Sequence, residues 1–176
     1  VAKLSRKSLK KVKFFVKDAT YTGKVITQKI TVKLGSKTLK LNKDYKISYK
    51  NNKKVGKATV TIKFKGNYSG TLKATFKILP KESKVEKLTA AKKSLKVKIK
   101  KVSSQATGYE IQYSTSSKFS SKYTKTKKVT SYKTTFVTLK SLSARKTYYV
   151  RVRTYKTVDG KKYYSDWSSK KYKKTK

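Results

Sequence analysis

The stretch Thr147–Lys156, TYYVRVRTYK, alternates aromatic or aliphatic residues with cations. Successive side chains of a β-strand point to opposite faces, so a period of two predicts a strand with two unlike faces. One face would carry Tyr148, Val150, Val152 and Thr154, and the other Tyr149, Arg151, Arg153 and Tyr155. We therefore expect a half-buried strand with an apolar inner face and a basic outer face.

The same alternation recurs along the whole chain, with turn-forming residues between the runs. Four such runs precede residue 80 and three more follow it: 29–35, 45–50, 59–66, 71–79, 94–102, 108–114 and 134–139. Asp159-Gly160 is a strong hairpin signal. Nowhere is there a convincing helical period. The sequence therefore predicts an all-β protein.

Pro80 is the only proline and ends a strand-like run, and a polar stretch follows it. This is the natural boundary between two domains, 1–80 and 81–176. Each part has the size of a small β-sandwich. We expect two tandem β-sandwich domains.

The second part resembles a fibronectin type III domain over about residues 84–176. In LSARKTYYVRV, Leu142 precedes Tyr148 by six positions and alternating valines follow, which is similar to the tyrosine corner of that family. Tyr164-Ser-Asp-Trp-Ser168 is similar to a motif on the last strand of some members. One departure is Ile99, where the family usually has a core tryptophan.

The first part resembles the immunoglobulin-like repeats of Gram-positive surface proteins over about residues 10–79. The matching segments are ATYTGKVITQKITVKLGSKTL, DYKISYKNNKKVGKATVTIK and GNYSGTLKATFKI, with Gln28 where the family usually has proline. Both resemblances imply modules of long extracellular bacterial proteins, usually non-catalytic. They therefore imply a location at the bacterial cell surface or cell wall.

Charge is the dominant feature of the composition. Fifty Lys and Arg face seven Asp and Glu, which gives a formal net charge of +43. Such a field attracts polyanions and opposes folding by self-repulsion, so stability should rise with salt. Nearly all the cations are lysines, hydrated point charges that bind with little selectivity.

Other classes of protein find little support. There is no cysteine, and no apolar run is long enough for membrane insertion. Neither a secretion signal nor an anchor is recognised at Val1 or Lys176, so we expect a cytosolic chain or a piece of a longer secreted one. With no histidine and few acids, we expect no enzyme, no cofactor and no metal site. A Lys isopeptide cross-link would need an assisting acid, for which the candidates are Asp18, Asp44, Glu86 and Glu110.

The most specific side-chain cluster is Trp167 with Arg151 and Arg153. If Trp167 lies on the strand next to Arg151 and Arg153, both guanidiniums can stack on the indole. A structural brace is the favoured reading, and a platform for a sugar or base is the alternative. The wider candidate surface adds an expected strip of exposed tyrosines and four C-terminal lysines: Tyr149, Tyr155, Tyr163, Tyr164, Tyr172, Lys170, Lys171, Lys173 and Lys174. Cross-strand packing is the favoured interpretation of the tyrosine strip, and ligand binding is the alternative.

The leading functional hypothesis is an adhesive or wall-associating module that binds teichoic acid, glycosaminoglycan or extracellular DNA through distributed lysine charge. One alternative is a passive spacer in a larger protein. Another is a specific receptor for a glycan, or for a host or neighbouring surface protein, that uses the Tyr–Trp face.

Overall fold

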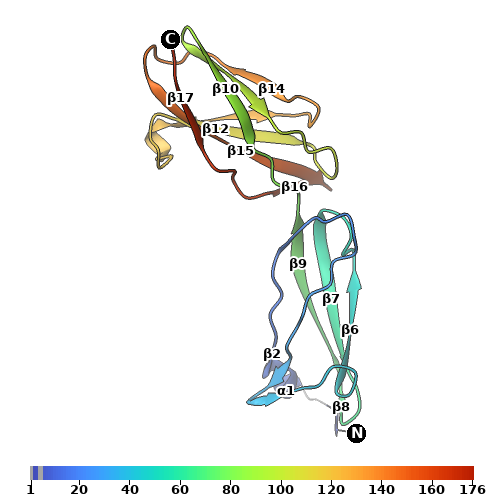
Figure 1. The fold of residues 1–176 in the computed structure, drawn as a ribbon. Coiled ribbons are helices and arrows are strands. Elements are labelled where there is room, and N and C mark those ends of the chain that lie inside the picture. The colour runs from blue at the N-terminus through green and yellow to red at the C-terminus, as the bar shows by residue number, and fades with distance from the viewer. Residues whose placement is uncertain (1, 4–5) are drawn as a thin grey trace. The chain divides into compact units, whose positions relative to one another are not determined.

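The computed structural model describes residues 2–3 and 6–176, with side chains from residue 8 onward. The chain divides into two compact units, Val1–Ile78 and Leu79–Lys176 (Figure 1). Nearly all regular elements are strands. The exceptions are a 3-10 turn, Ser121–Tyr123, and helix α1, Arg6–Lys10, which the sequence did not predict because five residues are too few to show a helical period.

The first unit is built mainly from two sheets. One has the order β3 (Ala19–Thr20), β9 (Thr71–Leu79), β7 (Gly56–Phe64) and β6 (Tyr45–Lys50). The other has the order β2 (Val12–Lys13), β4 (Lys33–Leu34) and β5 (Lys37–Thr38). In addition, β1 (Ala2–Lys3) pairs with β8 (Tyr68–Ser69) in parallel.

The core of the first unit follows the predicted alternation of β7. Val60 and Ile62 are fully buried, and Phe64 nearly so. They pack with Ile30, Val32, Leu39 and Tyr45, and a second cluster joins Ile26, Ala58, Phe76 and Ile78.

The strand expected over 29–35 is regular only at Lys33–Leu34, so this prediction is wrong in extent. In the segment just before it, at Ile26 and Gln28, hydrogen bonds from or to side chains replace pairing with a neighbouring strand. Asn52 Nδ2 donates to the Ile26 carbonyl at 2.7 Å, and Tyr49 OH donates to the Gln28 carbonyl at 3.0 Å. The Gln28 amide in turn bridges to the backbone N–H and C=O of Lys17, which proline at this position could not do.

The second unit packs a three-stranded sheet against a five-stranded one. The first has the order β10 (Val85–Ala91), β11 (Ser94–Ile99) and β14 (Phe136–Leu139). The second runs β13 (Thr124–Val129), β12 (Gly108–Ser114) and β15 (Thr147–Val158). On the far side of β15, β16 (Lys161–Tyr164) and β17 (Lys171–Lys174) pair with its two ends. This is the sandwich of fibronectin type III and immunoglobulin-like domains, and the predicted fold class is confirmed.

The inner face of β15 is buried as its alternation predicted. Val150, Val152 and Thr154 are fully buried, and Tyr148 is 8% exposed. The predicted tyrosine corner is present, because Tyr148 OH accepts the Ser143 N–H at 3.1 Å. Ile99 is buried in the same core.

The hairpin signal is also confirmed. Asp159 and Gly160 connect β15 to β16 with φ of 47° and 73°. Two consecutive positive φ angles are typical of the type I′ turn that suits a two-residue hairpin.

Candidate functional site

Arg151 and Arg153 stack between aromatic rings on the outer face of β15. Their guanidinium carbons lie 4.7 Å and 4.4 Å from the Trp167 ring centroid. Phe119 covers the other side of Arg151 at 4.1 Å, and Tyr164 covers Arg153 at 3.9 Å. The result is a ladder in the order Phe119, Arg151, Trp167, Arg153, Tyr164, called the Arg–aromatic ladder below.

Strand β12 supplies the hydrogen-bond acceptors of the ladder. Gln112 and Glu110 stand opposite Arg151 and Arg153 in the register. Arg151 Nε and Nη2 donate to Gln112 Oε1 at 2.9 Å and 2.7 Å. Burial, together with the neighbouring Arg153 charge, lowers the pKa of Arg151.

Trp167 reaches the ladder from an irregular segment rather than from a strand. It lies between β16 and β17, where Ser165 N–H donates to the Thr154 carbonyl and Ser168 N–H to the Val152 carbonyl. The Ser165 and Ser168 hydroxyls accept the N–H groups of the same two residues of β15. The stacking is therefore present, although Trp167 does not lie on a strand as the sequence argument had supposed, because two serines replace regular pairing.

Phe119 was missed by the sequence reasoning. It follows no alternating run and reaches Arg151 from a loop, where its backbone has a φ of 55°. The turn-forming run Ser114-Thr-Ser-Ser117 before it indicates a loop, but not where the ring would point.

The predicted tyrosine strip is split into two pairs. Tyr149 lies 5.8 Å from Tyr172, and Tyr155 lies 6.1 Å from Tyr164, between ring centroids. Tyr172 is 69% exposed, but Tyr155 is only 2% exposed. The expectation of an exposed Tyr155 is wrong because its strand partner is Gly108, which leaves space for the ring, and Lys128 Nζ lies 5.3 Å above it.

Tyr163 was also expected on the exposed strip and is only 7% exposed. It pairs with Lys156, which continues the inner-face positions of β15. The period of two therefore directs Tyr163 away from the side that carries Tyr164.

The four C-terminal candidate lysines do not form one surface. In β17, Lys171 and Lys173 stand opposite the inner-face residues Val150 and Tyr148, whereas Tyr172 stands opposite Tyr149. Lys174 shares the side of Tyr172, because side chains alternate. Lys170, just before β17, has its Nζ 5.6 Å from the Tyr149 ring centroid.

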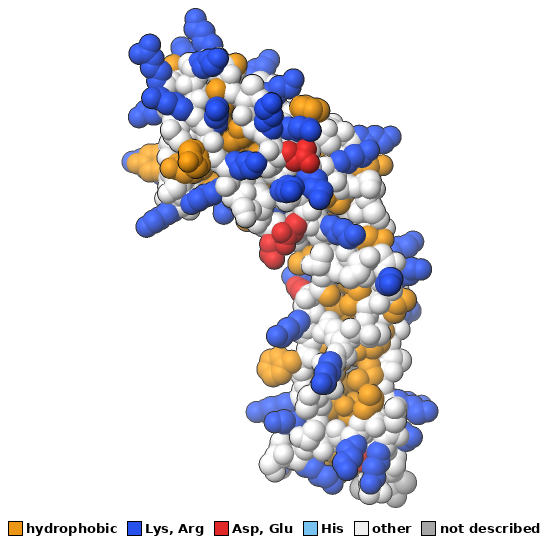
Figure 2. Space-filling model, viewed as in Figure 1, with side chains coloured by type: hydrophobic (Ala, Val, Ile, Leu, Met, Phe, Trp, Pro, Cys, Tyr) orange, Lys and Arg blue, Asp and Glu red, His pale blue; other side chains and the backbone are white. Residues whose placement is uncertain are grey.

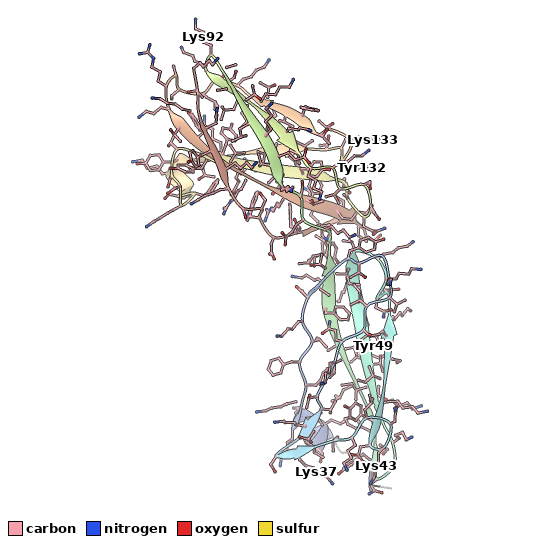
Figure 3. All side chains as sticks on the ribbon, viewed as in Figure 1. Lys37, Lys43, Tyr49, Lys92, Tyr132 and Lys133 are labelled. Carbon is pink, nitrogen blue, oxygen red and sulfur yellow. The ribbon has the colours of Figure 1, made fainter. Side chains whose placement is uncertain are left out.

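Exposed lysines are spread over both units. From residue 8 onward every lysine is exposed except half-buried Lys156. Figure 2 shows blue side chains scattered over the visible face and few red ones. Lys43, Lys92 and Lys133, labelled in Figure 3, lie in turns.

Few acids neutralise these lysines. Among the described residues there are three ion pairs: Lys77–Asp18, Lys98–Glu86 and Arg153–Glu110. Asp44 accepts the Lys40 N–H at 2.8 Å. The four acids considered for an isopeptide thus have backbone, lysine or arginine partners, and the described residues contain no acidic cluster able to hold a metal. No helix within 6–176 is long and apolar enough to span a membrane.

No protein-family model and no curated protein matches the chain. Among solved structures, the FN1–FN3 domains of chicken CNTN1 align over 69% of this chain and 42% of theirs, with 16% identity and a TM-score of 0.44. A multi-domain segment of titin aligns over 93% of this chain and 66% of its own, with 14% identity and a TM-score of 0.44. The chain thus spans less than two thirds of both, and the fold rests on its own strand order.

Proposed function

We propose that the chain is a non-catalytic extracellular module that binds polyanions through lysines distributed over its surface. The observation that supports this proposal is the imbalance of charge. Fifty cations face seven acids, and the described residues form three ion pairs. A net charge of about 2–8 is enough to keep a small domain soluble, so solubility alone does not account for +43.

Distributed lysines bind through counterion release rather than through one shaped site. Each exposed ammonium that meets a phosphate, sulfate or carboxylate releases condensed ions from the polyanion. Teichoic acid, glycosaminoglycan and extracellular DNA are the polyanions we propose. The bacterial surface or cell wall, which the family resemblances imply, is the proposed location.

A passive spacer is the second candidate, and the Arg–aromatic ladder favours it. Arg151 and Arg153 each direct Nε and Nη2 to a side chain of the neighbouring strand β12, Gln112 and Glu110 respectively. The most specific side-chain cluster of the chain is therefore largely satisfied internally, as a structural brace would be. A spacer would bind no polyanion at physiological salt.

The test is binding of the full chain to immobilised heparin, lipoteichoic acid, DNA and a neutral dextran from about 50 to about 500 mM salt. The proposal predicts binding to all three polyanions, none to dextran, and a common steep loss with salt. Absence of binding at about 150 mM would support the spacer. If the chain bound a single ligand and this binding survived high salt, the result would contradict binding through distributed charge and indicate a specific receptor site.

A further inference from the structure

The second unit contains a hollow beside the Arg–aromatic ladder. Its volume is about 440 Å³, and Arg151 is one of its lining residues. One wall is the loop Ser117–Phe119 and the other is the segment Ser168–Lys170. Lys170 Nζ donates to the Ser117 carbonyl at 2.8 Å and so joins the two walls.

The loop wall is held in a strained conformation. Phe119 has a φ of 55°, a left-handed value that bulky side chains rarely adopt. Its N–H donates to the Ser116 carbonyl at 3.1 Å, and Lys118 N–H donates to Ser116 Oγ at 3.3 Å. Residues held in such conformations concentrate at ligand-binding positions.

The lining of the hollow is cationic and hydroxylated. It includes Lys118, Lys170 and Arg151, with serine hydroxyls and no acid. Arg151 directs Nε and Nη2 to Gln112, and its Nη1 makes none of the hydrogen bonds found among residues 8–176. A hollow lined by one arginine and two lysines suits a tetrahedral oxyanion such as sulfate or phosphate.

A tyrosine pair continues this lining along the same sheet face. Lys170 links the hollow to this tyrosine pair. Its Nζ, which donates to the Ser117 carbonyl, also lies 5.6 Å from the centroid of the Tyr149 ring. Tyr149 packs against Tyr172, which is 69% exposed. An exposed ring next to cations and hydroxyls offers an apolar face for the C–H side of a sugar.

We propose that this hollow binds an acidic saccharide, with a sulfate or phosphate ester at Arg151, Lys118 and Lys170 and a sugar ring on Tyr172. The proposal rests on the proposed polyanion function and adds to it a subsite that distinguishes among polyanions. Sulfated glycosaminoglycan and glycosylated teichoic acid share this chemistry. Ser117 and Ser169 are exposed in the lining of the hollow, and their side chains suit hydrogen bonds with the hydroxyl groups of a sugar.

The test compares two double variants of the full chain. Lys118→Gln with Tyr172→Ala removes one cation that lines the hollow and the exposed aromatic ring beside it. Lys96→Gln with Phe136→Ala removes the same kinds of group from the opposite sheet, where Lys96 Nζ lies 5.3 Å from the ring of 53%-exposed Phe136. All four residues are exposed, so both variants should fold, and thermal unfolding checks this.

The probes are a heparin-derived hexasaccharide, a delipidated teichoic acid fragment and an oligothymidylate, at about 150 mM salt. We expect the hollow variant to lose about tenfold or more in affinity for the hexasaccharide or the teichoic fragment, and the control variant less than about threefold. Of these two probes, the one whose affinity falls more in the hollow variant identifies the source of the ester. Equal losses in both variants would overturn the subsite and leave the proposed function standing.

A loss confined to oligothymidylate would also overturn the saccharide proposal, because the ligand would then be a stacked base. If the wild-type chain bound no polyanion, the proposed function and the subsite would fail together. Trp167 gives a second readout, since it is the only tryptophan and stacks on Arg151. We expect saturable change of its fluorescence with hexasaccharide in wild type and in the control variant; an unchanged signal on saturation would contradict the site.

Discussion

Arg153 donates to Glu110 across strands β12 and β15, with Nε and Nη2 at 3.0 Å and 2.7 Å from the same oxygen, Oε2. The other oxygen accepts Tyr164 OH at 3.2 Å. The two charged side chains are 27% and 14% exposed. The carboxylate is therefore the partly buried acceptor that holds one end of the Arg–aromatic ladder.

Glu110→Gln should lower the free energy of unfolding by about 1–3 kcal/mol, because it leaves the partly buried Arg153 without its counter-charge. Urea unfolding followed by Trp167 fluorescence measures this. Glu86→Gln is the matched control, since its pair with Lys98 is more exposed, at 33% and 46%, and should change stability by under about 1 kcal/mol. Equal effects of the two variants would refute the account of the ladder.

Tyr148→Phe should destabilise the second unit by about 1 kcal/mol. The change removes the hydroxyl that accepts the Ser143 N–H and leaves the ring in place. Tyr123→Phe is a control because Tyr123 is 51% exposed, and we expect no measurable change from it. If Tyr148→Phe left the stability unchanged, water would satisfy the Ser143 N–H as well as the tyrosine hydroxyl does.

Gly108→Ala should cost about 3 kcal/mol or more. An added Cβ would lie 1.9 Å from the Val129 carbonyl oxygen, which belongs to the paired strand β13 and cannot move aside. Gly35→Ala separates this clash from backbone strain, because Gly35 has a φ of +61° with no atom within 4 Å. It should cost about 1–2 kcal/mol. Similar losses from the two changes, measured by thermal unfolding, would argue against the close packing of β12 on β13.

Tyrosine ionisation should be delayed in the folded protein. Burial raises the pKa of Tyr109, Tyr45 and Tyr155. A raised folded pKa means that the unfolded chain loses these protons first, so their contribution to stability is complete below about pH 10 and is lost as pH rises through the folded pKa. Phenolate absorbance should therefore appear at higher pH in native protein than in urea. Superimposable titrations would show that these rings are solvated.

Salt should stabilise the fold. The exposed lysines repel one another more strongly in the compact state than in the expanded chain, and added salt screens this repulsion. The free energy of unfolding should rise from about 50 to about 500 mM NaCl. A flat or falling dependence would show that self-repulsion is already compensated within the folded chain.

The period of two was enough to predict most of the fold. It correctly divided β15 into a buried face with Val150 and Val152 and an outer face with Arg151 and Arg153. It failed where side chains replace strand pairing. Ile30 and Val32 are buried outside any regular strand, and just before them Tyr49 and Asn52 donate to the carbonyls of Gln28 and Ile26.

The candidate site was predictable only where it lies on regular strands. The alternation of β15 placed Arg151 and Arg153 on one face, whereas Trp167 and Phe119, which stack on them, lie outside regular strands. Alternation also fails at Tyr155, whose burial depends on a partner strand presenting Gly108. The local sequence pattern of a strand does not show which residue of a partner strand, distant in the sequence, will stand opposite a given side chain.

The most direct test of the central claim is the affinity of the full chain for a DNA duplex as a function of salt, plotted as log K against log salt concentration. For many lysines acting together, we expect a straight line with a slope steeper than about −3, each phosphate contact adding about −0.9. Replacing single lysines such as Lys43 or Lys92 by Gln should reduce the slope by at most about 1. A slope near zero, or no binding at about 50 mM salt, would contradict polyanion binding through distributed charge.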